Sequence, residues 1–140
     1  MRLLLDSSAL LKHYVQEPGT AFVRARLREA DELLLSVLVW PEIHSSLNRL
    51  RREGALDDED YAAIKERFAE DFGNATVVAL AGGVLATSVR CLERARLRAS
   101  DAVHVASALE AGADRFVSAD RGQCWAARAF GLHVEEVATD

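Results

Sequence analysis

The chain has 140 residues, which suits a single domain over residues 1–140, and a domain of this size buries roughly 68% of its unfolded surface. It therefore needs no disulfide or structural metal in order to fold. Seventeen basic and 22 acidic residues give a net charge of −5, which excludes a broadly basic surface for coating nucleic acid but allows local contact with it.

Short apolar runs alternate with segments of helical periodicity along the whole chain. Strands are predicted at residues 2–5, 33–35, 75–80, 115–118 and 133–137. Helices are predicted at about 7–14, 20–30, up to 52, 58–72, 83–96, 100–112 and 123–130. Thr20, Asp57 and Ser100 are the expected N-caps, and Gly73-Asn74 is expected to be a turn. The alternation predicts an α/β fold with a five-stranded, mostly parallel sheet and helices on both of its faces.

Four acidic residues lie in or directly after apolar segments, where ionised side chains are costly to bury: Asp6, Glu42, Asp101 and Asp120. Asp6 and Asp120 follow predicted strands, and the other two lie on helices. Ligands of open parallel sheets bind beyond the carboxyl ends of the strands, so the four carboxylates are expected to converge there. Hard divalent cations such as Mg²⁺ and Mn²⁺ take oxygen ligands of this kind. The pattern therefore predicts a metal site suited to hydrolysing phosphodiesters.

Each carboxylate also has an ordinary explanation. Asp6 could simply cap the following helix, while Glu42 and Asp101 could be first-turn acids favoured by the helix dipole. Asp120 could be a turn residue beside Arg121. These explanations stay open, although together they require four separate coincidences.

Several other polar and aromatic side chains accompany the acids. Ser7, Ser8 and Ser118 could orient carboxylates or serve as ordinary caps. His104 lies one helical turn after Asp101, where it could bind metal or pack as a hydrogen-bonded neighbour. The two tryptophans, at positions 40 and 125, are interpreted as core or interface anchors rather than as base-stacking platforms.

Four segments in this order resemble the PIN-domain ribonucleases, and in particular the VapC-type toxins of toxin–antitoxin pairs. They are LDSSALLK at 5–12, PEI at 41–43, SDAVHVASA at 100–108 and FVSADR at 116–121. The resemblance covers essentially the whole chain. Two departures stand out: Ser118 replaces the threonine of many relatives but keeps a hydroxyl, and Pro41 would kink a helix that began at Ser36.

The resemblance implies a Mg²⁺- or Mn²⁺-dependent endoribonuclease that leaves a 5′-phosphate and a 3′-hydroxyl. It implies an acidic metal site of Asp6, Glu42, Asp101 and Asp120, with Ser7 or Ser118 assisting. It also implies a homodimer, and inhibition by a cognate antitoxin whose tail blocks the acidic pocket.

Phosphate contacts to the RNA are expected from arginines, which suit bidentate binding: Arg49, Arg51, Arg52 and Arg121. A cytoplasmic protein is expected, because no leader or apolar run of about 18 residues is present and Cys91 and Cys124 read as free thiols. Two other functions compete. One is a haloacid-dehalogenase-like phosphatase with Asp6 as nucleophile, although Ser8 stands where a second acid is wanted. The other is a noncatalytic binding protein with the same fold.

Overall fold

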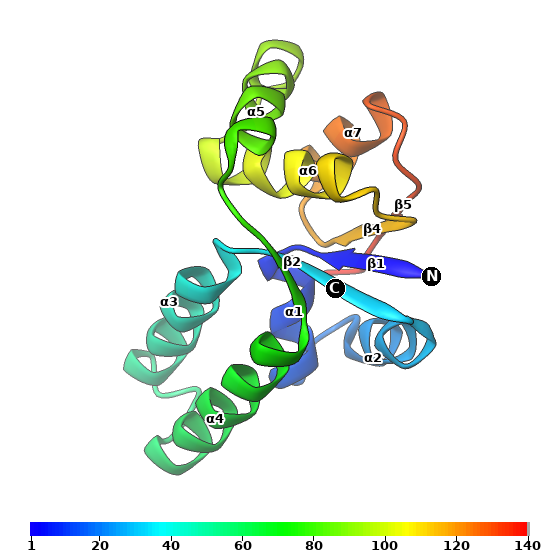
Figure 1. Ribbon diagram of the computed structural model, residues 1–140. Helices are drawn as coiled ribbons and strands as arrows, with labels where there is room; N and C mark the ends of the chain where they lie inside the picture. The colour runs from blue at the N-terminus through cyan, green and yellow to red at the C-terminus, as the bar shows by residue number, and fades with distance from the viewer. Residues whose placement is uncertain (140) are drawn as a thin grey trace.

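A computed structural model describes residues 1–139 of the chain, in which strands and helices alternate as expected (Figure 1). The elements are β1 (Arg2–Leu5), α1 (Ser7–Tyr14), α2 (Thr20–Glu29), β2 (Glu32–Ser36), α3 (Val39–Arg52), α4 (Asp58–Asn74), β3 (Thr76–Val78), α5 (Gly82–Arg94), α6 (Ala99–Ala111), β4 (Arg115–Ser118), α7 (Arg121–Ala129) and β5 (Val134–Glu136). Among these residues no helix has both the length and the apolar character needed to cross a membrane.

The five strands form one sheet in the order β3-β2-β1-β4-β5, and every neighbouring pair is parallel. Helices α1 to α4 cover one face of the sheet and α5 to α7 cover the other (Figure 1). The α/β class and the two-sided helical cover are therefore confirmed, and the sheet is parallel throughout. Because β1 is central, its carboxyl end lies between those of β2 and β4.

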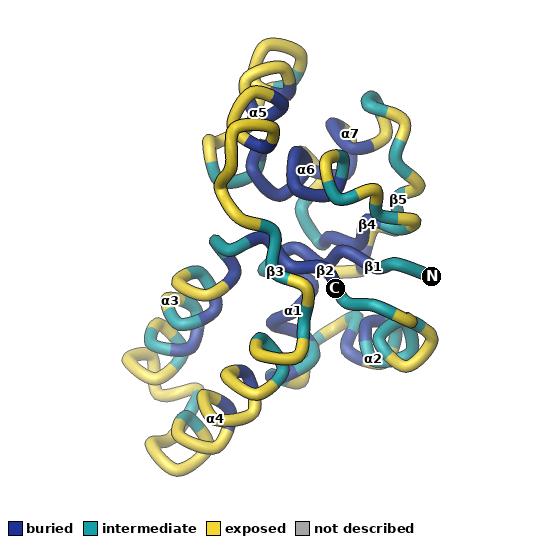
Figure 2. The backbone as a smooth tube through the Cα atoms, viewed as in Figure 1, coloured by how far each residue is buried: buried dark blue, intermediate teal, exposed yellow. Residues whose placement is uncertain are grey.

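The central strand is buried on both faces, as its unbroken run of leucines predicts. Leu3 and Leu5 belong to the hydrophobic cluster under α1 to α4, whereas Leu4 belongs to the cluster under α5 to α7. Side chains alternate across a strand, so one short run of leucines supplies both cores. Figure 2 shows β1 and β2 as mostly buried, while much of α5 is exposed.

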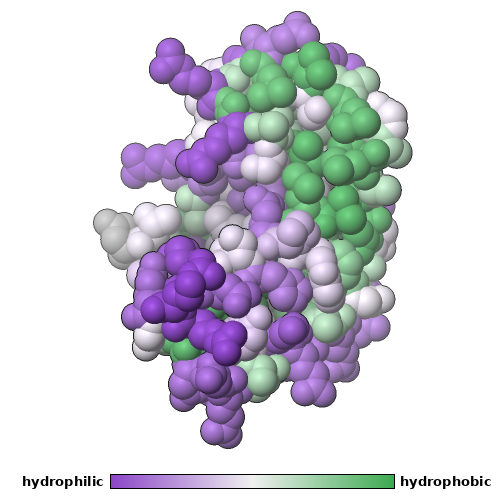
Figure 3. All heavy atoms as spheres, turned by 90° about the vertical axis from the view of Figure 1, so that its left-hand side faces the viewer, coloured by the Kyte–Doolittle hydropathy of each residue, from purple (hydrophilic) through white to green (hydrophobic). Residues whose placement is uncertain are grey.

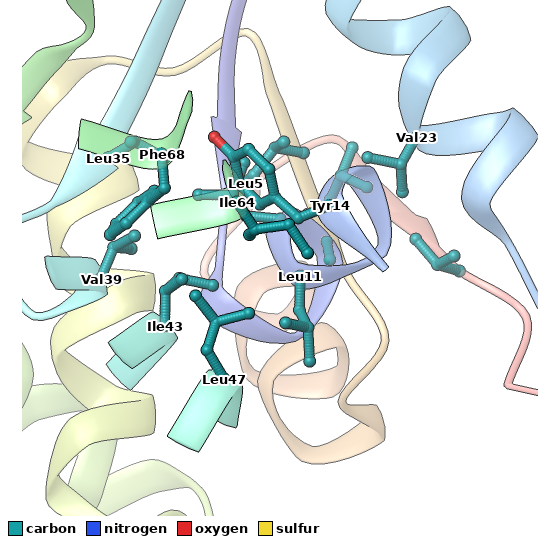
Figure 4. Packing of buried hydrophobic residues seen from close by; sticks show 14 of the residues in the cluster. Leu5, Leu11, Tyr14, Val23, Leu35, Val39, Ile43, Leu47, Ile64 and Phe68 are labelled. Atoms are coloured by element: carbon teal, nitrogen blue, oxygen red, sulfur yellow. The ribbon is translucent and has the colours of Figure 1, made fainter. Parts of the chain in front are cut away.

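The larger core packs helices α1, α3 and α4 against the sheet (Figure 4). Ile43 and Leu47 of α3 point into this core, which also contains Phe68 of α4, and all three are fully buried. Burying each such side chain is worth about 1.5–3 kcal/mol. This core fixes the start of α3 against the end of β1, which is where the candidate site lies.

Several predicted boundaries were wrong by a few residues. The expected turn at Gly73-Asn74 is the last turn of α4, which continues to Asn74. Gly73 keeps a helical conformation there, because the helix ends only where Ala75 becomes extended and leads into β3. Asp57 caps this helix as predicted, since its Oδ1 accepts the N–H of Asp60 at 2.7 Å.

The predicted caps of two other helices were also misplaced. Ser100 lies inside α6, whose N-cap is Arg98, because the Asp101 carboxylate accepts the backbone N–H of Arg98. Thr20 is the first residue of α2 and follows Gly19, which adopts a left-handed conformation with φ of 95°. Its hydroxyl instead accepts the backbone N–H of Glu17, which closes the preceding turn.

Candidate active site

Asp6 and Ser118 meet at the carboxyl edge of the sheet, directly after β1 and at the end of β4. The backbone N–H of Asp6 donates to Val117, which extends the β1–β4 pairing to the first residue of the site. Parallel strands deliver both residues to the same edge, as the sequence predicted.

The Asp6 carboxylate is almost completely buried, with only 1% of the residue exposed. It accepts hydrogen bonds from the Ser8 hydroxyl at 2.8 Å, the Ser118 hydroxyl at 2.7 Å and the Ala9 N–H at 2.9 Å. Burial raises the pKa of Asp6, even though His104 and these donors favour the ionised form. Asp6 caps α1, so the ordinary explanation of this residue is correct. Capping alone, however, does not require the carboxylate to be buried so deeply.

Glu42 enters the site from the first turn of α3. The helix begins at Val39, so Pro41 occupies the first turn, where its missing N–H breaks no helical hydrogen bond and no kink is required. Glu42 Oε1 accepts the Ser7 hydroxyl at 2.9 Å and contacts His104 Nε2 at 2.5 Å. Burial alone would raise the pKa of Glu42, but the bonds and charge of His104, with Ser7, lower it.

Asp101 and Asp120 are joined by Gln123. Its side-chain Nε2 donates to Asp101 Oδ1 at 2.9 Å, and its backbone N–H donates to Asp120 Oδ1 at 2.8 Å. Asp120 is thereby the N-cap of α7, which begins at Arg121, two residues earlier than predicted. The Asp120 backbone N–H donates in turn to Ser118, the residue that holds Asp6.

Hydrogen bonds join three of the acids in a chain, and the fourth, Glu42, is bonded to two residues that lie close to that chain in the sequence. Ser118 connects Asp6 to Asp120, and Gln123 connects Asp120 to Asp101. Asp101 lies one helical turn before His104, which contacts Glu42, and Glu42 binds Ser7 beside Asp6. The structure thus brings together all four predicted acids along with Ser7 and Ser118.

The four acids do not form one compact cluster of carboxylates. No three His, Cys, Asp or Glu side chains within residues 1–139 gather closely enough to form a ready-made metal cage. A small hard cation that keeps several of its waters fits such a spaced set, because Mg²⁺ needs only one or two carboxylates plus substrate phosphate. Gln123 Oε1, which is buried and has no hydrogen-bond partner among these residues, offers a further hard oxygen.

The predicted arginines lie at different distances from this edge. Arg121 directly follows Asp120 and is largely exposed. Arg49 and Arg52 lie seven and ten residues after Glu42 on the same helix, or roughly 10–15 Å along its axis. Arg49 lies 3.9 Å from Glu53, so it is partly engaged already.

Sequence reasoning did not single out Gln123. Its position three residues after Asp120 is where an N-cap side chain receives a backbone N–H, so spacing alone could have placed it beside Asp120. Its second contact, to Asp101 of α6, has no signal in the sequence. His104 was expected either to bind metal or to pack against a partner, and the structure gives it Glu42 as that partner.

The amino-acid sequence matches the PIN domain family over residues 3–129. The chain belongs to the PIN-domain family. Its relatives include ribonucleases VapC45 and VapC49 of Mycobacterium tuberculosis strains, each 34% identical over 138 residues, covering 96% of this chain and 95% of theirs. The resemblance to VapC-type proteins is therefore confirmed.

Solved structures share the same PIN fold. VapC20 of Mycobacterium tuberculosis, described as a Sarcin-Ricin loop cleaving toxin, superposes with a TM-score of 0.65 at 13% identity, over 93% of this chain and 95% of its own. A chain of a toxin–antitoxin complex from Klebsiella pneumoniae gives a TM-score of 0.64 at 13% identity, over 84% and 86%.

Proposed function

We propose that this chain is a metal-dependent endoribonuclease that acts, as one nuclease domain in the cytoplasm, as the toxin of a toxin–antitoxin pair. The observation that carries the proposal is the hydrogen-bonded set of polar side chains that holds Asp6, which is almost completely buried, near three further carboxylates at one edge of the sheet. RNA is supported as the substrate by relatives that are named ribonucleases and that match this chain over nearly its whole length.

Asp6, Glu42, Asp101 and Asp120 are the residues that would hold a Mg²⁺ or Mn²⁺ ion. When bound, the ion supplies Lewis acidity that activates water and stabilises the charge developing on the phosphate. Ser118 keeps the Asp6 carboxylate oriented toward the edge of the sheet, and Ser7 does the same for Glu42. The contacts of His104 and Ser7 with Glu42 lower the pKa of Glu42, against the effect of burial, and so favour its ionised form.

The phosphatase alternative has less support. A carboxylate nucleophile needs a free oxygen facing its substrate, whereas the Ser8 hydroxyl lies 2.8 Å from both oxygens of Asp6. The noncatalytic alternative is opposed by the complete acidic set.

We also propose a homodimer and a protein antitoxin as partners. Figure 3 shows a band of hydrophobic side chains along one side of the face toward which the strands end. Leu85, Val89 and Leu92 repeat at helical spacing on the exposed side of α5, which suits association with a second copy. The similarity to a toxin–antitoxin complex supports the antitoxin.

The direct test is cleavage of a panel of RNAs in the presence of Mn²⁺. The wild-type protein should cut, and Asp6→Asn should lower the rate by about 100- to 1,000-fold, as loss of a charge-stabilising group does elsewhere. Asp60→Asn, which makes the same charge change on the exposed start of α4, should keep full activity. Full activity of Asp6→Asn would refute the assignment of the site. A wild-type protein that cleaves none of the RNAs would refute the proposed function.

A further inference from the structure

Trp125 is the most exposed large hydrophobic side chain near the acidic edge, with 56% of the residue accessible. It lines a cavity of about 320 Å³ together with Arg94, Ala95, Arg96 and Gly122. That volume lies at the lower end of the range for ligand pockets. An exposed indole that shares a cavity with two arginines is a combination suited to stacking a base and binding its phosphate.

The cavity adjoins the proposed active site. A β-carbon built on Gly122 would lie 3.2 Å from Asp120 Oδ1 and 3.9 Å from the carbonyl oxygen of Arg96, so this part of the cavity wall lies beside the Asp120 carboxylate. On the other side, Asp101 accepts the backbone N–H of Arg98, which holds the loop between α5 and α6 in place. Gly122 of the cavity wall directly precedes Gln123, the residue that joins Asp101 and Asp120, so the cavity adjoins the carboxylates on that side.

We propose that this cavity holds an unpaired base of single-stranded RNA next to the cleaved phosphodiester, with Trp125 as the stacking platform and Arg96 as a phosphate contact. The proposal rests on the ribonuclease function proposed above, and it names the form of RNA that the site takes. It revises the interpretation of Trp125 as a core or interface anchor.

The other exposed tryptophan shows why Trp125 is different. Trp40 packs its ring against Phe68 and Phe72, with centroids 5.4 Å and 4.9 Å away. No aromatic ring within residues 1–139 packs against Trp125. Trp125 is thus exposed and not part of an aromatic cluster, so it can take a base as a stacking partner, whereas Trp40 is already packed against other rings.

The charges around the cavity are complementary to a nucleic-acid backbone. The exposed Arg96 and Arg98 form no ion pair with any other residue of 1–139. Arg94 stacks its guanidinium 5.4 Å from the Phe130 ring, which fixes its position at the rim. Unpaired guanidinium groups beside a set of carboxylates, in a chain of net charge −5, favour a partner that carries phosphates and reaches the acids through a cation.

The test is a double-mutant cycle in which Trp125 is changed in the protein and one base is removed from the RNA. Cleavage of short single-stranded RNAs by the wild type is compared with cleavage of the same RNAs carrying one abasic nucleotide at successive positions near the cut. At one position the wild type should lose about 5- to 150-fold in kcat/KM, which is the contribution expected from one stacked base. Trp125→Ala should show a similar loss on intact RNA and no further loss at that position, while Trp125→Phe should restore much of the effect.

The outcomes separate this inference from the proposed function. Arg96→Ala should weaken cleavage, while Arg28→Ala, the same change on the exposed surface of α2 across the sheet, should not. If Trp125→Ala cleaves intact RNA as fast as the wild type and loses as much activity as the wild type at every abasic position, the stacking role is refuted and the ribonuclease stands. If Trp125→Ala changes only the sedimentation behaviour of the protein, Trp125 is a protein contact and the inference is refuted. A wild type that cuts no RNA refutes both.

Discussion

Leu5 and Asp6 are consecutive and almost equally buried, yet they belong to opposite kinds of environment. Leu5 is fully buried in the hydrophobic cluster beneath α1 to α4, and Asp6 is 1% exposed in a network of hydroxyl and amide groups. Within two consecutive residues the chain passes from a hydrophobic core, which stabilises the fold, to a buried carboxylate, whose charged form is costly to bury. The comparison teaches that this edge of the sheet is built at the expense of stability, as functional sites often are.

The largest expected contrast is between substitutions at these two positions. Leu5→Ala should lower the free energy of unfolding by about 2–5 kcal/mol, because it leaves a cavity in the core. Asp6→Asn should raise the unfolding temperature of the metal-free protein at pH 7, because burial raises the pKa of Asp6 and its charge is therefore destabilising above that pKa. Thermal denaturation of both variants in EDTA measures the contrast. Equal destabilisation by both would show that Asp6 is only a structural cap.

The second contrast concerns His104, which is as buried as Asp6 but contacts Glu42. His104→Leu has a similar volume and should lower kcat by about 10- to 100-fold. It should also move the acid limb of the pH–rate profile to higher pH, because His104 lowers the pKa of Glu42 and burial would then raise it. His133→Ala, at an exposed histidine, is the control and should leave the profile unchanged. A lower rate with an unmoved profile would assign His104 a purely structural role.

A smaller effect is expected at Ser118, whose hydroxyl donates to Asp6 and accepts from Asp120. Ser118→Ala leaves both groups without this partner and should cost about 1–3 kcal/mol of stability together with roughly tenfold in activity. Ser118→Thr keeps the hydroxyl and should retain most of the activity. Measured urea denaturation and cleavage rates that rank threonine with alanine would contradict the role of the hydroxyl.

The smallest effect lies away from the acidic edge, at His13 of α1. Burial lowers the pKa of His13, against the attraction of Asp71, so the unfolded chain takes up a proton first as the pH falls. Stability from this group is therefore complete above about pH 6.5 and declines as the pH falls toward the lowered pKa. His13→Gln should flatten that part of the stability–pH curve. An unchanged slope in urea denaturation between pH 7 and 5 would show that His13 does not contribute.

Much of the fold was predictable because its signals are local. The apolar run before Asp6 predicted a strand buried on both faces, and the alternation of Leu3, Leu4 and Leu5 between two cores confirms it. Helix ends were harder to predict, since residues such as Ser100 and Thr20 favour caps in general while tertiary contacts decide which residue caps. The predicted cap at Ser100 failed because the Asp101 carboxylate holds the backbone of Arg98.

The four candidate acids stand out in the sequence, whereas the groups that connect them do not. Charged residues after buried strands stand out in a sequence, because they break the apolar pattern. Gln123 and the contact between His104 and Glu42 depend on α6 and α7 meeting other elements, which no local pattern reports. Of the two roles expected for Trp125, its exposure excludes the core and leaves the interface untested, since exposure of a large aromatic residue is decided by packing and not by its neighbours in the chain.

The most direct test of the central claim, that the four carboxylates form one divalent-cation site, is calorimetric titration of Mn²⁺ into the wild type, Asp6→Asn, Asp101→Asn and the control Asp60→Asn. The account predicts saturable binding to the wild type and to Asp60→Asn, and strongly weakened binding to the two site variants. Binding of Mn²⁺ to Asp6→Asn with wild-type affinity, or no saturable binding to the wild type, would contradict it.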